Sequence, residues 1–409
     1  MLNKFIQNYF LVLFSLIPIS IILGSSISLF NILLIDISFV IFLIFHRDFS
    51  FIRHESIKYL FLLYLYLIFN SLISVNFESG IFRNLGFIRI IILFVAINYF
   101  FKDNKFLNKV LSCWLLIITF VSIDILVEVA TGKNLIGYGE LYGRRVVSFF
   151  KDEPIVGGYI NSFYLILIGF LFYSFKKDNK NLILFFSIFL FLSIFLTGER
   201  SNSIKALLAF LLFYGLLKEY NFKQKIGAVV IFIIFLTTFI FNSEYFKTRY
   251  VNQIKTSFST NQVYLELYKS GFKVFKDNPF FGVGNKNYRI VACDKISKEN
   301  TTSNDDYICN THPHQIYFEF LSEHGIIGTL IVFYIFYKLI FLKLIRNINS
   351  LNYIQLGSSI FIVVVFTPII PSGSFFNDYS ITLFSLNLSI FYAANPLFNI
   401  FNSYKNNIK

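Results

Sequence analysis

Three of the chain's five histidines lie within the short segment Thr311–Gly328, and histidine is a common general base. Thr311 is a candidate helix N-cap and Pro313 is tolerated in a first turn, so we expect a short helix to begin here. The free N–H groups and dipole at a helix N-terminus attract anions and disfavour imidazolium. His312 and His314 could therefore act as a base beside an anion, or could simply cap the helix and bond a loop carbonyl.

Two arginines are candidate phosphate ligands. Arg200 lies in a polar break between two apolar runs, where an ionisable group is costly and indicates function. Its planar fork suits phosphate oxygens, although an ion pair with Glu199 or contact with lipid headgroups would also explain it. Arg249 follows the ninth apolar run and could be a second phosphate contact or only an interfacial basic anchor.

Cys293 and Cys309 lie in one polar segment and could form a disulfide in an oxidising compartment. Two free thiols remain an alternative, and a structural zinc site is a weaker one because the chain has no Cys-x-x-Cys pair. Asp-x-Asp, Walker, His-Glu-x-x-His and Gly-x-Ser-x-Gly motifs are also missing from the sequence. We therefore expect no metal, no cofactor and no nucleotide hydrolysis.

The elements that position these residues are apolar helices. The 409 residues are 56% hydrophobic and only 14% charged, and apolar runs of membrane-spanning length recur along the chain. The net charge of +13 could indicate a nucleic-acid partner, but the basic residues are dispersed over short loops rather than clustered on one face. The composition predicts an all-α polytopic membrane protein that contacts membrane lipids and no nucleic acid.

The apolar runs predict about 12 transmembrane helices. Their approximate positions are Phe5–Gly24, Ser26–Phe45, Lys58–Ser74, Leu85–Phe101, Leu107–Val129, Val156–Phe175, Leu182–Thr197, Ser203–Leu217, Ile226–Phe241, His324–Leu344, Gln355–Ile370 and Ser380–Leu397. Lysine and arginine gather in alternate short loops, which predicts that both termini are cytoplasmic.

Two outer connections are long in this arrangement. One spans about residues 130–155, and the other, residues 242–323, is long enough to form a mainly helical periplasmic domain between spans 9 and 10. We therefore divide the chain into spans 1–9 (residues 1–241), this loop domain with the catalytic motif (242–323), and spans 10–12 with the cytoplasmic C-terminus (324–409).

The chain resembles the bacterial O-antigen ligase and polymerase superfamily. The resemblance rests on His312-Pro-His-Gln followed by Glu323-x-Gly-x-x-Gly, on Pro279-Phe-Phe-Gly-Val-Gly, on Arg200 after a mid-chain span, on Ser148–Tyr159 and on the twelve-span plan. Gln315 departs from the Asn that is common in the family, but it keeps an amide.

This resemblance implies a membrane glycosyltransferase of the inner membrane with a periplasmic active site. It would transfer a glycan from an undecaprenyl diphosphate-linked donor to an acceptor hydroxyl, with His314 as base, His312 as the alternative base, and Arg200 and Arg249 on the diphosphate. The acceptor would be lipid A core in a ligase or the growing glycan in a polymerase, and both readings stay open. A transporter is the competing class, but paired interrupted helices and a chain of buried carboxylates are missing from the sequence.

Overall fold

The computed structural model describes residues 4–139, 145–151, 153–175, 179–259, 263–298 and 307–402. Within these residues the chain forms helices and loops, and extended pairing is limited to one isolated bridge between Lys133 and Gly139. The predicted all-α class is confirmed. Parts of the predicted first outer loop (140–144 and 152) and of the predicted cytoplasmic C-terminus (403–409) lie outside the described residues.

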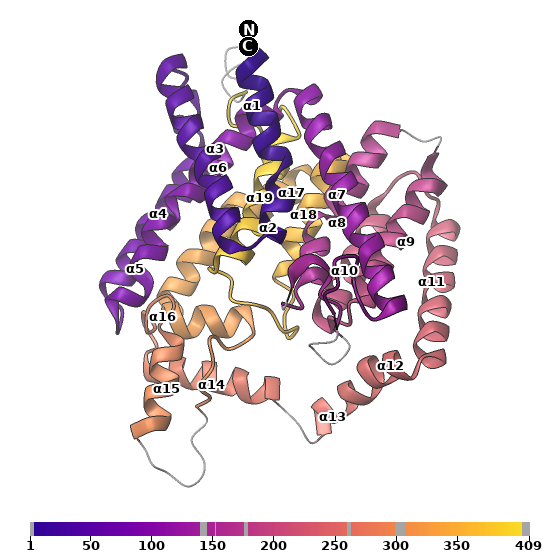
Figure 1. Cartoon of the computed structure of the whole chain (residues 1–409). Helices are drawn as coiled ribbons and strands as arrows, with labels where there is room; N and C mark the ends of the chain where they lie inside the picture. Colours follow the sequence, from indigo (N-terminus) through magenta and orange to yellow (C-terminus); the bar gives the residue numbers. More distant parts are fainter. Residues whose placement is uncertain are drawn as a thin grey trace.

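The N-terminal half begins with helices that run back and forth between the two ends of the molecule (Figure 1). α7 (Asn104–Thr131) illustrates why they begin and end where they do: Asp103 caps its first turn, and Gly132 ends it in the left-handed region at φ 81°. The preceding helices are α1 (Lys4–Ser15), α2 (Ile17–Ile22), α3 (Ser25–His46), α4 (Glu55–Leu72), α5 (Phe77–Gly86) and α6 (Ile88–Phe101).

α8 (Val156–Phe175) lies in the interior, and most of its residues are buried. It packs against α18 (Tyr353–Val365) through glycines: a Cβ added at Gly169 would lie 2.2 Å from the carbonyl oxygen of Tyr353. Small residues allow such close helix contact in membrane proteins. The neighbouring helices are α9 (Lys180–Leu196), α10 (Arg200–Leu216) and α19 (Asp378–Ala393), and α11 (Phe222–Asn242) lies at the edge (Figure 1).

Seven helices are long and apolar enough to cross a membrane within the described residues. They are Lys4–Ile22, Ser25–His46, Phe77–Phe101, Asn104–Thr131, Val156–Phe175, Phe222–Asn242 and Ile316–Asn347, and two shorter apolar helices are Lys180–Leu196 and Tyr353–Val365. A polytopic membrane protein is therefore supported, and the count of twelve spans stays a prediction.

A group of short helices gathers at one end of the molecule (Figure 1). They are α12 (Glu244–Lys247), a π-helical turn (Thr248–Asn252), α13 (Gln253–Ser259), α14 (Val263–Asp277) and α15 (Tyr288–Lys298). α14 packs against the start of α16 (Ile316–Phe336), which continues through a π-helical turn into α17 (Leu342–Asn347). A second small hydrophobic core, which includes Val274, Val283 and Tyr288, joins α14, the loop after it and α15.

Both ends of the described chain lie at the other end of the molecule (Figure 1). The ring of Phe401 lies 5.1 Å from that of Tyr99 at the end of α6 and 5.5 Å from that of Phe51. The first and last described segments therefore share one end, opposite the short outer helices. That this end is cytoplasmic stays a prediction.

Candidate functional site

The histidine segment leads into α16 but is not helical itself. α16 begins at Ile316, and Gln315 is its N-cap, with Oε1 accepting hydrogen bonds from the N–H groups of Tyr317 (2.8 Å) and Phe318 (3.1 Å). The prediction that Thr311 caps this helix was wrong, because His314 adopts a left-handed conformation with φ 56° that interrupts a helical path. The histidines therefore lie in a bent, non-helical segment before α16, residues 311–315, which we call the histidine strap.

His312 has both ring nitrogens engaged. Nε2 lies 3.2 Å from the carbonyl oxygen of Ser372, which can only accept, so Nε2 carries the proton. Nδ1 is then the acceptor for the hydroxyl of Thr311 at 3.0 Å. His312 is nearly buried and bonds a loop carbonyl, as the structural alternative predicted.

His314 has a ring without a hydrogen-bond partner among the described residues. The ring packs against His312 (centroids 4.1 Å apart) and edge-on to Tyr264 (6.2 Å), while the backbone carbonyl accepts from the N–H of Ser372 at 2.9 Å. Burial, together with the neighbouring His312, lowers the pKa of His314 to about 4. The imidazole is neutral at pH 7 and its lone pair is available as a base.

α16 is interrupted nine residues after its start. Gly325 has φ 63° and ψ −172°, so the N–H groups just after it lack partners within the helix. The carbonyl of Pro279 accepts from Ile326 (2.8 Å) and that of Phe280 accepts from Ile327 (3.1 Å). The loop that carries the Pro279 motif thus caps the second half of the helix.

The same loop also satisfies the first half. Val283 N–H donates to the carbonyl of Ser322 (3.0 Å), and Gly284 N–H donates to that of Glu323 (2.9 Å). Gly282 directly precedes these two residues at φ 68°, and an added Cβ there would lie 2.5 Å from the carbonyl carbon of Glu323. The glycines of this motif are needed because the loop backbone touches the helix backbone.

Arg249 is placed beside the turn that precedes Arg200. Its Nε donates to the carbonyl of Gly198 at 2.9 Å, and Nη1 donates to Gln253 at 2.7 Å. Burial and the charges of Arg145 and Arg200 lower the pKa of Arg249, so three guanidinium groups gather here. Such a cluster of like charges is suited to bind a polyvalent anion.

Glu199 does not pair with Arg200, which was the structural alternative for this arginine. Its carboxylate accepts from the N–H groups of Gly157 (2.5 Å) and Gly158 (3.3 Å) and from Asn202 (2.6 Å). Burial raises the pKa of Glu199 to about 7, partly offset by these bonds. The carboxylate caps the start of α8, and Arg200 has no ion-pair partner within the described residues.

A cavity of about 280 Å³ lies between α8, α10, α18 and the loop before α19. On one wall are Asn202 and Lys205 of α10, and on another are Ser372 and Ile316. Ser372 is the residue that hydrogen-bonds both to the ring of His312 and to the backbone of His314. The cavity therefore connects the start of α10 with the histidine strap.

A larger cavity of about 850 Å³ opens beside it, with walls mainly from α2, α3 and α7. The two cavities share Ile155 and Tyr379. Most of the lining is apolar, for example Leu29 and Phe120. Its apolar walls and position between long apolar helices suit a hydrocarbon chain.

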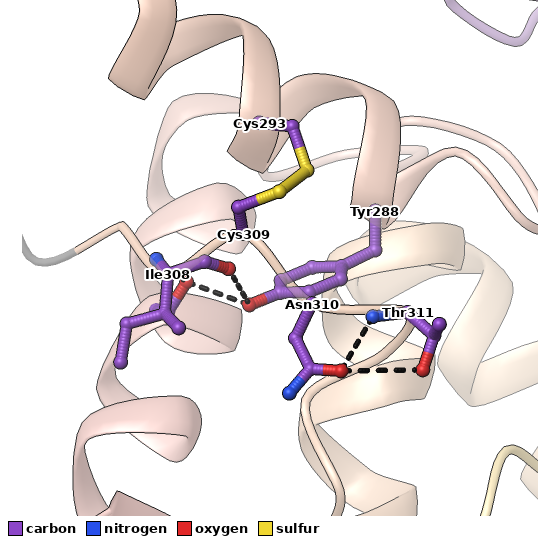
Figure 2. Close-up of a disulfide and its surroundings, with 7 residues drawn as sticks. Tyr288, Cys293, Ile308, Cys309, Asn310 and Thr311 are labelled. Atoms are coloured by element: carbon purple, nitrogen blue, oxygen red, sulfur yellow. Dashed lines mark hydrogen bonds between the residues drawn. A yellow bond between two sulfur atoms is a disulfide. The ribbon is translucent and has the colours of Figure 1, made fainter.

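A disulfide joins Cys293 of α15 to Cys309, three residues before His312 (Figure 2). The hydroxyl of Tyr288 donates to the carbonyl of the adjacent Ile308 at 3.2 Å (Figure 2), and the N–H of Ile308 donates to Ser270 at 2.9 Å. The strap that carries the histidines is thus anchored covalently at its beginning.

Sequence reasoning missed Lys286, which follows the Pro279 motif directly. Lys286 donates to the hydroxyl of Ser374, which in turn donates to Glu319 of α16 at 2.5 Å. This chain fixes the segment of Ser372 against α16. It also missed Lys205, although a lysine within an apolar run was a signal in the sequence.

Groups of three or more His, Cys, Asp and Glu side chains that could hold a metal ion do not occur in the described part of the chain. The candidate site consists of the two strap histidines, the cationic side chains near Arg200 and the two cavities.

Residues 185–333 match the family model described as O-antigen ligase. The matched region runs from α9 to the second half of α16, so it contains Arg200, Arg249, both strap histidines and the disulfide. No curated protein matches the chain.

Proposed function

We propose, on the premise that the chain belongs to the O-antigen ligase and polymerase superfamily, that it transfers a glycan from undecaprenyl diphosphate to an acceptor hydroxyl. The glycan is an O-antigen or a related polysaccharide. The protein lies in a bacterial inner membrane, with the histidine strap at the periplasmic face and both termini in the cytoplasm.

The observation that carries the proposal is the free ring of His314. His312 is held by Ser372 and Thr311, whereas His314 is neutral, partly buried and without a ring hydrogen bond in the described part of the molecule. A base needs this combination because its lone pair must reach the proton of an incoming hydroxyl. We therefore assign His314 as the base and His312 as the residue that orients it.

Arg200 and Arg249 are assigned to the diphosphate. They lie together with Arg145 beside a turn that Glu199 fixes, and Glu199 is occupied by α8. Positive charge held in place before the reaction stabilises the charge that develops on a leaving diphosphate. The large apolar cavity offers a place for the undecaprenyl chain.

The reaction then follows from these roles. His314 removes the proton of the acceptor hydroxyl, and the oxygen bonds to the anomeric carbon of the glycan. The bond from this carbon to the diphosphate oxygen breaks, and its electron pair leaves with undecaprenyl diphosphate. The proton on His314 returns to the solvent, so the base is regenerated for the next turnover.

The acceptor is lipid A core in our leading proposal, which is a ligase. A polymerase, which extends the glycan on the same carrier, uses the same donor and the same residues. A deletion strain separates them: full-length chains that accumulate on the carrier without reaching lipid A core indicate a ligase, and products of one repeat unit indicate a polymerase.

The direct test is transfer by the purified protein. Defined lipid-linked donor and acceptor should give a glycosylated acceptor and free undecaprenyl diphosphate in equal amounts. Absence of both products with every acceptor offered, from protein that is folded and monodisperse, would contradict the proposal.

A further inference from the structure

Lys205 is a buried lysine that has no partner in the described part of the chain. It lies in the second turn of α10 and is only 8% exposed. Among the described residues its ammonium group has no hydrogen bond and no ion pair, and its side chain lines the cavity of about 280 Å³. An unpaired charge in such a position is costly, and an anionic ligand in the cavity would remove that cost.

One carboxylate, that of Glu199, lines the same cavity. Glu199 accepts hydrogen bonds from Gly157 and Gly158 of α8 and from Asn202. Asn202 and Lys205 are three residues apart on α10 and line the same cavity, so both face its interior. Among the described residues no ion pair joins Lys205 to Glu199, so the ammonium group can accept an anionic ligand in this cavity.

The opposite wall adds to the positive potential. Asn377 and Ser380, at the start of α19, line the cavity, and a helix N-terminus favours an anion. Asp378 in this turn is paired with Arg83 and Arg89, so its negative charge is compensated.

Part of the remaining lining is apolar, with Phe361, Leu383 and Phe384 among its residues. It shares Ile155 and Tyr379 with the large apolar cavity. A ligand that fills both would combine an anionic group with a long hydrocarbon, as a polyprenyl phosphate does.

The position of Lys205 along α10 indicates which of the two phosphates of a lipid diphosphate it would contact. Lys205 lies five residues further into α10 than Arg200, which is about 7 Å along a helix axis. Arg200 is at the outer end of this helix, so Lys205 lies nearer the interior of the bundle. The phosphate attached to the prenyl chain is the deeper one of a lipid diphosphate.

We propose that Lys205 binds the prenyl-side phosphate of the lipid carrier, in the cavity between α10, α18 and the start of α19. This rests on the proposed function, because it takes the donor to be a lipid diphosphate. Arg200 and Arg249 then hold the sugar-side phosphate, and Lys205 selects carriers whose phosphate can reach this depth.

The test measures binding and needs no turnover. Protein in phosphatidylcholine nanodiscs is titrated with undecaprenyl monophosphate and with undecaprenyl diphosphate, both without sugar. Lys205→Met should weaken binding of both about tenfold or more, and Lys205→Arg should restore part of the affinity. Arg200→Met should weaken binding of the diphosphate more than that of the monophosphate.

Controls separate a specific contact from general charge and folding. Lys269→Met removes an exposed lysine of α14 and should leave both affinities unchanged. Without ligand, Lys205→Met should have a Tm equal to or above that of the wild type, because it removes an unpaired buried charge.

Three results overturn the inference: folded Lys205→Met that binds both lipids like the wild type, a wild type that binds neither lipid, or dependence on Lys205 only for phosphatidylglycerol added to the nanodiscs. The proposed function is tested separately, by measuring glycan transfer by His314→Ala. That variant should lose transfer and keep both affinities, so either idea can fail without the other.

Discussion

The carbonyl oxygen of Ser372 lies 3.2 Å from Nε2 of His312, and this contact fixes which nitrogen of the ring carries the proton. The same residue donates its N–H to the backbone carbonyl of His314. One residue of the loop before α19 therefore holds both histidines of the strap, yet it leaves the ring of His314 free. This difference separates two residues that the sequence pattern treats alike.

Replacing the two histidines should have unequal effects. We expect His314→Ala to lower kcat by about 10² to 10⁴, the usual contribution of a general base. His312→Gln keeps an N–H donor for Ser372 and should retain transfer within about tenfold of the wild type. Transfer of a labelled glycan by purified protein measures both, with His46→Ala at the other end of the molecule as control. Near-normal transfer by His314→Ala would reject its assignment.

On the acid side, activity should fall only at an unusually low pH. Burial and His312 lower the pKa of His314 to about 4, compared with about 6.5 for a free histidine. The neutral base is therefore present above this pKa, and activity should fall only as the pH drops through it. A kcat/KM profile between about pH 3 and 8, in His312→Gln as well as the wild type, measures this limb. A limb centred near 6.5 would contradict the assigned environment.

The arginines should matter through geometry as well as charge. Arg249→Lys keeps the charge but loses the bond from Nε to Gly198, and Arg200→Lys loses the planar fork. We expect either variant to raise KM for the lipid-linked donor about tenfold, since a bond to a charged group is worth about 1.5–3 kcal/mol. Arg346→Met, an exposed change in α17, is the matched control. Unchanged KM in both variants would remove the arginines from the diphosphate site.

The glycine turn should tolerate no side chain. Gly282→Ala would place a Cβ 2.5 Å from the backbone of Glu323 at a φ of 68°, so the loop could no longer cap α16. We expect loss of folded protein or a Tm lower by several degrees. Gly227→Ala is a suitable control, because an added Cβ there meets no atom within 4 Å and α11 is regular. Equal Tm values for the two variants would show that the contact is unimportant.

The disulfide should stabilise the outer helices. A closed loop of about this size contributes about 3 kcal/mol in the chain-entropy description. We expect Cys293→Ser with Cys309→Ser to lower Tm and to speed proteolysis in the region of α15, and a reductant should reproduce this in the wild type. Cys113→Ser should respond to the reductant as the wild type does. A wild type whose Tm and cleavage rate are insensitive to reductant would refute the role.

The sequence predicted an all-α chain and its long apolar helices, because membrane-spanning length and apolar composition are local properties of the sequence. The predicted tenth span begins at His324, one residue before the break at Gly325. Local patterns also marked the histidines and arginines, since charged and titratable groups are rare near apolar runs. Such residues can be recognised from their neighbours in the sequence, without knowledge of contacts between distant segments.

Other features depended on contacts between distant segments. Ser372 gave no signal because its role depends on meeting a strap about 60 residues earlier. Local preference favours Thr311 as an N-cap, whereas the observed cap, Gln315, is not of a preferred residue type. From local sequence alone, Lys205 looks like a lysine whose side chain reaches the membrane–water interface. The packing of α18 and α19 encloses it in a cavity instead. These positions are decided by packing rather than by local sequence.

The clamped break in α16 also bears on how the protein is made. The side-chain amide of Asn70 in α4 donates to the carbonyl of Glu323, 253 residues later, and its side-chain oxygen accepts from the N–H of Asn285, 215 residues later. At a synthesis rate of about 5–20 residues per second, these partners leave the ribosome roughly 10–50 seconds after Asn70. The contacts that fix the break in α16 to α4 therefore form only after the segment that carries Asn285 and Glu323 has been synthesised.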